Sequence, residues 1–417
     1  MAGISDHYSV IVVGGGPAGA CTAGLLAKRG HRVLVLERES FPRYHVGESM
    51  ITGIVSILDQ LDLTERLDRM GFPRKYGLSL VWGKDRTLWD VKFKEGGPHE
   101  YSYHVTRADF DQLLLTRARE LGAHVVERAT VKEPIFEGER VAGVRYSSPG
   151  AEDREVRSSL VIDASGEART ISRHLTDVTW HEDLQNLAIW SYFKGCGSLP
   201  EEQQGNILVE KVRDRNGWFW SIPLAGEITS VGYVAPTEDI RSAKKPTPDM
   251  FWENVDRTRE LRGLMAGAVP VGDFRTCRDW SYISKRFHGP GWVAVGDAAC
   301  FIDPLLSTGV CLGMLCSGAL AYACGMALNR PEQEADIFQE YEQGARIFLT
   351  ESADYVRFFY DSDRDREDYF ELAHSMRASI GDIAPRQSFV ALVSGYMAMS
   401  SLFDFNKFGT SDDIFAE

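Results

Sequence analysis

From Tyr8 to Gly19 the chain runs YSVIVVGGGPAG, a short apolar segment followed directly by closely spaced glycines and a proline. The apolar segment predicts a buried strand, and the glycines predict a tight turn after it. Residues 17–29 then predict a helix that ends at Gly30, and residues 32–37 predict a second strand. Together these segments predict a compact β-α-β unit at the start of the chain.

The turn itself matches the G-x-G-x-x-G pattern of dinucleotide-binding proteins through Gly14, Gly16 and Gly19, with Ala18 inside it. Such glycines let backbone N–H groups and the start of a helix approach a pyrophosphate. Glu37, at the end of the second predicted strand, can accept a hydrogen bond from a ribose hydroxyl. A purely structural glycine turn is the alternative, but strand, helix and acid all stand where nucleotide binding needs them.

The composition is that of a globular protein of 417 residues, with 60 acidic and 46 basic side chains and a net charge of −14. This balance argues against binding to nucleic acid or to a membrane surface. The seven cysteines include no C-x-x-C pair, which favours reduced thiols in a cytoplasmic enzyme. No metal site is predicted, and the first apolar segment is too short for a signal peptide.

One apolar segment, Val310–Leu328, has no charged residue and is long enough to cross a membrane. It is rich in small residues, Gly, Ala, Ser and Cys, and it follows a loop motif. We therefore expect a buried helix that packs closely against other backbone, and no membrane contact.

Residues late in the chain favour a flavin over a nicotinamide. Asp297 follows a predicted strand at residues 291–295, and residues 303–310 (DPLLSTGV) precede the apolar helix. These segments resemble the p-hydroxybenzoate-hydroxylase-like flavoproteins. The resemblance implies that Asp297 holds the ribityl chain of FAD and that the helix starting near Val310 points its positive end at the flavin ring, where it stabilises the reduced form.

Two more segments look like flavin-contacting motifs of this group. In the first, Arg43 precedes Glu48 and Ser49; in the second, Arg107 opens a predicted helix over residues 107–121. Arg43 and Arg107 could equally be surface charges. Their settings favour contact with the cofactor.

The resemblance implies an α/β flavoprotein fold of the p-hydroxybenzoate-hydroxylase type. We expect a Rossmann-type FAD domain, an antiparallel-sheet substrate domain, and a helical segment at the C-terminus. Strand-like, aromatic segments lie between the flavin motifs, so the FAD domain is predicted to be discontinuous. The predicted bounds are 1–76, 105–185 and 270–345 for the FAD domain, 77–104 and 186–269 for the substrate domain, and 346–417 for the C-terminal extension.

Over nearly its whole length the chain resembles the flavin-dependent halogenases within this superfamily. The motifs that carry the resemblance, beside the glycine turn, are Gly47-Glu48-Ser49, residues 72–77 (FPRKYG), residues 218–223 (WFWSIP, matching W-x-W-x-I-P) and residues 303–310. The lysine at position 75 together with W-x-W-x-I-P is specific, because few other flavoproteins show both.

The resemblance implies that reduced FAD (FADH2), O2 and chloride or bromide generate hypohalous acid, which moves through a passage to Lys75 beside the substrate. The backbone amides of Thr308 and Gly309 match the halide site of the family. An ammonium can polarise hypohalous acid, or a neutral amine can be halogenated by it, and the pKa of a buried lysine is easily shifted to suit either route. Composition alone would make Lys75 a surface lysine.

Trp218 and Trp220 lie two residues apart on a predicted strand, so they share one face, with Phe219 on the other. The resemblance implies that they occlude the space over the flavin, so that only small halogen species move on. Ordinary core packing is the alternative, and both interpretations can hold together.

The class of substrate is predicted from one difference between this chain and the tryptophan halogenases. Tryptophan halogenases carry a glutamate immediately before the Ser-Thr-Gly, where this chain has Leu306. An acceptor that is already electron-rich, such as a phenol or pyrrole, is therefore expected, and segments near the C-terminus (361–370 and 388–395) look more like the phenol-type members. Some relatives act on carrier-tethered substrates. The arginines that could dock a carrier protein, or form a solvated helical face, are Arg357, Arg364, Arg366 and Arg377.

Other functions stay open on the sequence alone. A flavin hydroxylase or epoxidase of the same fold, a prenyl-chain reductase, and a non-catalytic flavin-binding partner protein are the rivals. No site for reducing the flavin with a nicotinamide is evident, so a separate flavin reductase is expected. Asp279 stands in a segment that resembles one whose aspartate bonds covalently to FAD in at least one relative, although most relatives bind FAD non-covalently.

Overall fold

The computed structural model describes residues 7–361, 363–376, 383–396 and 402. Its first sheet has the strand order β17-β18-β10-β1-β2-β7, with β9 and β8 continuing from β10. The strands β18, β10, β1, β2 and β7 run parallel, as the β-α-β start predicts. The bounds are β1 His7–Val13, β2 Val33–Leu36, β7 His124–Val126, β8 Thr130–Glu137, β9 Arg140–Ser147, β10 Arg154–Asp163, β17 His288–Gly289 and β18 Trp292–Ala294.

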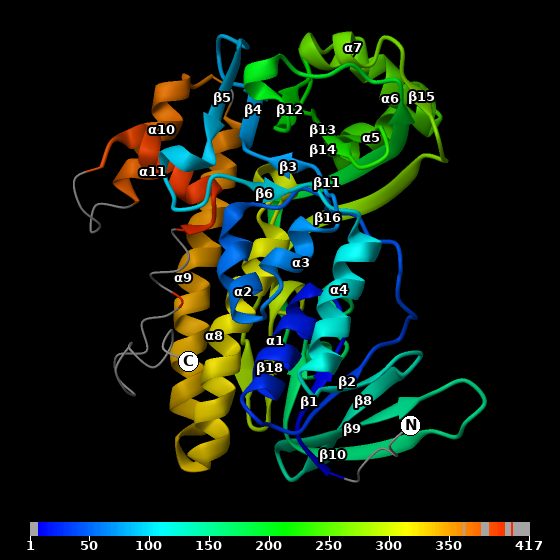
Figure 1. Cartoon of the computed structure of the whole chain (residues 1–417), viewed down its shortest axis with the longest axis vertical. Helices are drawn as coiled ribbons and strands as arrows, with labels where there is room; N and C mark the ends of the chain where they lie inside the picture. The colour runs from blue at the N-terminus through cyan, green and yellow to red at the C-terminus, as the bar shows by residue number, and fades with distance from the viewer. Residues whose placement is uncertain (1–6, 362, 377–382, 397–401, 403–417) are drawn as a thin grey trace.

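The second sheet has the order β19-β16-β11-β14-β13-β12-β4-β5, and β15 pairs with β11. It lies at the top of Figure 1, away from the first sheet. Its bounds are β4 Gly77–Val81, β5 Leu88–Lys92, β11 Val178–Lys194, β12 Ile207–Lys211, β13 Trp218–Leu224, β14 Ile228–Pro236, β15 Val269–Pro270, β16 Arg275–Ser284 and β19 Cys300–Phe301. A short ribbon of β3 (Arg74–Lys75) and β6 (Ser102–Tyr103) lies apart from both sheets.

Helices cover the first sheet and reach the second. Figure 1 shows α8 and α9 side by side along one flank of the first sheet, with α9 continuing up to α10 and α11. The principal helices are α1 Pro17–Lys28, α4 Arg107–Glu120, α8 Gly309–Asn329, α9 Glu334–Tyr360, α10 Arg366–Ser375 and α11 Pro385–Val393. The shorter ones are α2 Val55–Gln60, α3 Thr64–Asp68, α5 Thr237–Ala243, α6 Thr247–Val255 and α7 Glu260–Leu264.

The apolar segment after the Ser-Thr-Gly is helix α8. By length and composition it could cross a membrane, but 78% of its most apolar window is buried inside the protein. It packs closely on α1, where the hydroxyl of Ser317 donates to the carbonyl of Ala18 at 2.8 Å. Small residues permit this close approach of two helix backbones. The predicted buried helix is confirmed.

Two hydrophobic clusters lie on opposite faces of β13. Trp218 and Trp220 belong to the large cluster that is continuous with the first sheet, while Phe219 belongs to a smaller one under α6 and α7. This is the alternation expected of a strand that is buried on both faces. The predicted placement of the two tryptophans on one face is confirmed.

Several element bounds differ from the sequence-based expectation. Residues 51–70, in the range predicted for the FAD domain, form a 3-10 turn and the short helices α2 and α3. Strand β16 belongs to the second sheet although it falls in the range predicted for the FAD domain, and α9 crosses the predicted boundary at 345–346 without a break. The three-part domain division remains a proposal.

Candidate active site

A cavity of about 570 Å³ lies between the two sheets, at the carboxyl ends of the parallel strands. That edge is where ligands bind in open α/β sheets. It is lined by the glycine turn, Glu37, the loop from Arg43 to Ser49, the inner faces of β11 and β13, and the start of α8. The sequence-predicted site residues among its lining are Gly14, Gly16, Ala18, Glu37, Arg43, Glu48, Ser49, Arg107, Trp218, Trp220, Asp297, Gly309 and Val310.

The glycine turn leaves no room for larger side chains. A Cβ on Gly14 would lie 2.4 Å from the carbonyl oxygen of Ala164, and one on Gly19 would lie 2.0 Å from that of Gly14. Gly14 also has φ +105°, a conformation that favours glycine. Gly16 is the N-cap of α1, so the free N–H groups of the first helical turn face the cavity end of the sheet.

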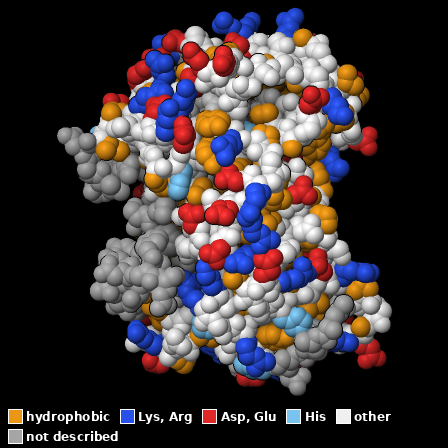
Figure 2. All heavy atoms as spheres, in the orientation of Figure 1, with side chains coloured by type: hydrophobic (Ala, Val, Ile, Leu, Met, Phe, Trp, Pro, Cys, Tyr) orange, Lys and Arg blue, Asp and Glu red, His pale blue; other side chains and the backbone are white. Residues whose placement is uncertain are grey.

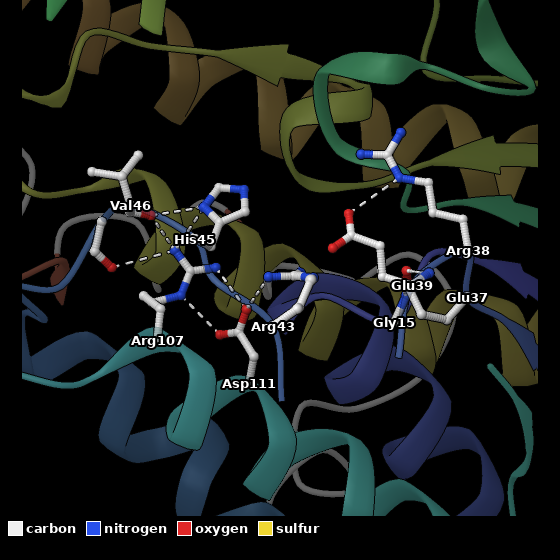
Figure 3. Close-up of polar contacts among 10 residues, drawn as sticks. Gly15, Glu37, Arg38, Glu39, Arg43, His45, Val46, Arg107 and Asp111 are labelled. Atoms are coloured by element: carbon white, nitrogen blue, oxygen red, sulfur yellow. Dashed lines mark hydrogen bonds and ion pairs between the residues drawn. The ribbon is translucent and has the colours of Figure 1, made fainter. Parts of the chain in front are cut away.

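Glu37 ties the turn to the end of β2. One carboxylate oxygen accepts from the N–H of Gly15 at 2.7 Å, and the other accepts from the N–H of Glu39 at 2.7 Å (Figure 3). A carboxylate offers about four acceptor positions, so Glu37 can still accept from a ribose hydroxyl in the cavity that it lines.

Arg43 and Arg107 converge on the same carboxylate. Arg107 makes a bidentate pair with Asp111 at 2.8 and 2.9 Å, and Arg43 contacts Asp111 at 3.1 Å (Figure 3). Arg107 also donates to the carbonyl of Val46 at 2.7 Å. The two arginines therefore hold the loop from Arg43 to Ser49 in place as well as lining the cavity. Asp111, which orients both, is buried.

Glu48 has one satisfied and one free carboxylate oxygen. Oε1 accepts from the hydroxyl of Tyr192 at 2.6 Å, whereas Oε2 has no hydrogen-bond partner among the described residues. Burial raises the pKa of Glu48. A buried polar atom of this kind that lines a cavity points to a polar ligand there.

The start of α8 is shaped by the loop before it. A 3-10 turn at Pro304–Leu306 is capped by Asp303, whose carboxylate accepts from the N–H of Leu305 at 3.0 Å. Ser307, with φ +57°, then turns the chain into α8. Gly309 and Val310 line the cavity with N–H groups that have no intrahelical partner. Thr308, the N-cap, is buried and is not among the described residues lining the cavity.

A hydrogen-bond network that the sequence did not reveal links Trp218, which with Trp220 forms the tryptophan wall of the cavity, to this loop. The hydroxyl of Tyr360, at the end of α9, donates to Asp303 at 2.9 Å and accepts from Nε1 of Trp218 at 2.8 Å. Asn186 donates to the same oxygen of Asp303 at 2.8 Å. Trp220 is held separately by the hydroxyl of Ser230 at 3.2 Å. No sequence spacing could connect these residues, since they come from different elements.

Two further carboxyl groups, those of Asp279 and Asp297, line the cavity beside this network. Asp279 lines the cavity, and neither of its oxygens has a hydrogen-bond partner among the described residues. Burial and the nearby Asp303 raise the pKa of Asp279 well above its ordinary value, while burial raises that of Asp303 to about 6. Burial likewise raises the pKa of Asp297 to about 7.

Lys75 lies outside the cavity lining and is fully buried. Its ammonium nitrogen has no hydrogen-bond partner among the described residues and lies 5.5 Å from the centre of the Phe93 ring. Burial lowers the pKa of Lys75 from 10.5 to about 7, against an opposing effect of Cys311 in the first turn of α8. A surface lysine is therefore excluded, and Lys75 is not among the described residues that line the cavity.

The cavity fits FAD. The glycine cradle, the free N–H groups of α1 and α8, and the free oxygen of Glu48 are the donors and acceptors that a dinucleotide and a flavin ring need. Gly14, Gly16 and Glu37 would hold the pyrophosphate and ribose, and Gly309 and Val310 would face the flavin ring. Bound in reduced form, FAD supplies the reaction of O2 with a halide.

The fold and cavity define a flavin-dependent enzyme with a two-sheet architecture. Residues 9–100 and 89–383 match the family model described as tryptophan halogenase, and the chain belongs to that family. It is 34% identical to a tryptophan 2-halogenase of Chondromyces crocatus, over 94% of this chain and 76% of that one. It is also 34% identical to a sulochrin halogenase of Aspergillus terreus, over 79% and 65% respectively.

Solved structures agree with the family assignment. A myxobacterial chondrochloren halogenase is 32% identical, with a TM-score of 0.82 over 95% of this chain and 98% of that one. A flavin-dependent brominase is 26% identical, with a TM-score of 0.83 over 98% and 97%. The protein is accordingly an FADH2-dependent halogenase that uses a halide, and such enzymes generally act on an aromatic substrate with a separate flavin reductase.

Replacing Tyr360 by Phe should destabilise the protein by about 1–3 kcal/mol, because Nε1 of Trp218 would lose its partner in a buried setting. The measurement is urea unfolding. Tyr369→Phe is the matched control, since that hydroxyl makes one ordinary bond to the carbonyl of Asp361. Equal losses in the two variants would show that Tyr360 ties nothing beyond a single hydrogen bond.

Replacing Lys75 by Met should stabilise the protein at pH 7 by on the order of 2–4 kcal/mol. The reason is that folding buries the amine of Lys75 and lowers its pKa, which costs free energy that the uncharged Met side chain does not incur. Between pH 7 and 10.5 the unfolded chain binds more protons than the folded one. Wild-type stability therefore rises with pH over this range, and the gain from Met should vanish near pH 10.5.

Urea unfolding at several pH values measures this gain. The exposed Lys84, replaced by Met, is the control, and it should change stability little at any pH. A gain that did not depend on pH would contradict the lowered pKa of Lys75.

Proposed function

We propose that hypohalous acid made in the cavity passes to Lys75, which presents the halogen to an electron-rich aromatic ring. The observation that carries the proposal is the fully buried, unpaired amine of Lys75. An amine in that position costs stability, so its retention calls for a chemical role. Its pKa of about 7 leaves both the ammonium and the free amine accessible at neutral pH.

The first turn of α8 supports a short route between the two places. Gly309 and Val310 border the cavity, while the thiol of the next residue, Cys311, acts electrostatically on Lys75. Backbone amides at the start of this helix, those of Thr308 and Gly309, are the groups we propose for the halide. The halide, chloride or bromide, would thus be oxidised on the cavity side of the turn and used on the other side.

Trp218 and Trp220 are proposed to keep the organic substrate from the flavin. Both line the cavity and are almost fully buried, and their ring centres are 6.2 Å apart. Because their indole N–H groups are both hydrogen-bonded, the rings are held in one orientation. A wall of this kind admits O2 and halogen species and excludes an aromatic ring.

The acceptor is proposed to be a phenol or pyrrole. Leu306 is buried in the loop before α8 and offers no carboxylate to remove a proton from an unactivated ring. The name of one relative, a tryptophan 2-halogenase, makes an indole the competing acceptor. The setting would be natural-product biosynthesis, as for antibiotics, with FADH2 delivered by a separate reductase.

The arginines that suggested carrier docking are largely neutralised. Arg357 pairs with Asp183 and Asp354, and Arg364 and Arg366 each pair with a neighbouring acid. Arg377 lies outside the described residues. The face shown in Figure 2 likewise carries acidic and basic side chains interspersed. These pairs favour a free substrate, and a carrier-tethered one remains the alternative to be tested.

A cytoplasmic location is proposed from the cysteines. All seven lie in the described residues, and none of them forms a disulfide. Free thiols of this number are usual where the surroundings are reducing.

Replacing Lys75 by Ala should lower halogenation by at least about 100-fold while FAD binding is retained, because the cavity does not include Lys75. Product is measured by mass spectrometry with a flavin reductase, O2 and halide, and FAD binding by fluorescence titration. Lys84→Ala serves as the exposed control. Unaltered turnover by Lys75→Ala would overturn the role of the lysine.

A substrate panel tests the acceptor. Free and carrier-bound phenols and pyrroles should gain halogen, seen as a chlorine or bromine isotope pattern, because their rings need no added base. Free tryptophan should react at least about tenfold more slowly. Preferential halogenation of tryptophan would overturn the argument from Leu306, and a gain of one oxygen without halogen would indicate a hydroxylase instead.

A further inference from the structure

Around Lys75 lies a group of buried polar atoms that the proposed chemistry has not used. Oγ of Ser49, Oγ of Ser102 and Nδ1 of His104 are buried, and none has a hydrogen-bond partner among the described residues. The ammonium nitrogen of Lys75 shares this condition. Leaving a single buried polar atom without a hydrogen bond costs free energy, so four such atoms together indicate a bound small molecule that pairs with them.

The backbone places these four side chains on one face. Lys75 stands directly opposite Ser102 in the β3–β6 ribbon, and Ser49 stands directly opposite His104 in an isolated antiparallel bridge. Opposed residues in an antiparallel pair project to the same side, and so do residues two apart in extended backbone. Ser102 is in β6, and His104 directly follows that strand. The four polar groups therefore face a common interior region.

The hydrogen bond of His104 decides what it can offer. Its Nε2 donates to the carbonyl of Gly205 at 2.9 Å, because a carbonyl can only accept. Nδ1 is then the unprotonated nitrogen and presents a lone pair. Burial, and in addition the charge of Lys75, lower the pKa of His104 to about 3, so the ring stays neutral at pH 7. His104 is thus an acceptor beside the amine.

The group connects the flavin cavity with the lysine. Ser49 lines the cavity, whereas Lys75 does not. The bridge partner of Ser49 is His104, which directly follows β6, and β6 is paired with β3, the strand of Lys75. A small molecule that left the cavity at Ser49 would meet His104 and Ser102 on its way to Lys75.

The chemistry of the four groups selects the bound small molecule. A halide ion can only accept hydrogen bonds, so it would leave the lone pair of His104 unpaired and facing a negative charge. Hypohalous acid has one O–H donor and an oxygen that accepts. His104 can take the donor, while the hydroxyls of Ser49 and Ser102 and the amine of Lys75 can donate to the oxygen.

We propose that Ser49, Ser102 and His104 form, with Lys75, the binding site for hypohalous acid. Nδ1 of His104 accepts its O–H, and Lys75 donates to its oxygen. With the oxygen held from two sides, the halogen atom is the part left free to meet the acceptor ring. This site rests on the proposed passage of hypohalous acid to Lys75 and adds the groups that hold it there.

Two substitutions of His104 separate the bonds that the ring makes. His104→Gln can keep the donor to the carbonyl of Gly205 and removes the Nδ1 acceptor. His104→Asn can place an amide oxygen near the position of Nδ1 and gives up the bond to Gly205. His174→Gln makes the first change at an exposed histidine and serves as the control.

The first measurement compares two products, each per FADH2 consumed. One is halogenated phenol, and the other is hypohalous acid that escapes into solution and is trapped there by added taurine. His104→Gln should lower the product at least about tenfold and raise the trapped fraction correspondingly, while His104→Asn should retain more product than His104→Gln. An unchanged ratio of the two products in His104→Gln, with the surface control also unchanged, would overturn the site.

The second measurement does not depend on turnover. A crystal structure of the flavin-free protein should show an ordered water within hydrogen-bond distance of Nδ1 of His104 and Nζ of Lys75, and His104→Gln should lose it. Only apolar atoms against Nδ1 would overturn the proposal. The two proposals can fail separately. If Lys75 has no role in halogenation, Lys75→Ala keeps its product. The ratio of halogenated phenol to trapped hypohalous acid in His104→Gln still tests the binding site.

Discussion

The carboxylate of Asp303 is the junction on which the site depends. It caps the turn that leads into α8, and it accepts from Asn186 on the second sheet and from Tyr360 on α9. Tyr360 in turn holds Trp218. One buried group therefore fixes the start of the helix that borders the cavity, the sheet above it and the tryptophan wall. Buried polar networks of this kind are costly when incomplete and rigid when every member is paired.

The bonds that Asp303 accepts also limit its electrostatic cost. Burial raises its pKa to about 6, while its hydrogen bonds from Leu305, Tyr360 and Asn186 act in the opposite direction. Asp279, which has no such bonds among the described residues, is shifted well above its ordinary pKa. Burial thus raises the pKa of both carboxyl groups, but only for Asp303 do hydrogen bonds oppose the shift.

Lys75, unlike Asp303, is buried without a hydrogen-bond partner among the described residues. A buried amine with no partner is a stability cost that the chain carries, and the same burial brings its pKa into the range where proton transfer at neutral pH is easy. The cavity and the lysine occupy different places, joined at the first turn of α8 and at the bridge between Ser49 and His104. In the proposed function, this separation would let a small oxidant move while the two larger reactants stay apart.

Local patterns in the sequence were enough for the glycine turn, the following helix, the alternation at Trp218 and Trp220, and the buried character of α8. Each rests on neighbours in the chain, through turn conformation or side-chain period. The family resemblance added Lys75 as a site residue. It did not bring out the contacts of Tyr360 with Asp303 and Trp218, which are 57 and 142 residues away.

The cluster around Lys75 was equally hidden, because Ser49, Ser102 and His104 become neighbours only when β3, β6 and the loop after Gly47 meet. The sequence by itself determined that the first turn suits a dinucleotide and that Trp218 and Trp220 share one face of β13. Tertiary structure alone decided that Lys75 is buried and unpaired, and how its pKa is shifted. The reason is physical: backbone preference acts between adjacent residues, whereas desolvation of a charge depends on every segment packed around it.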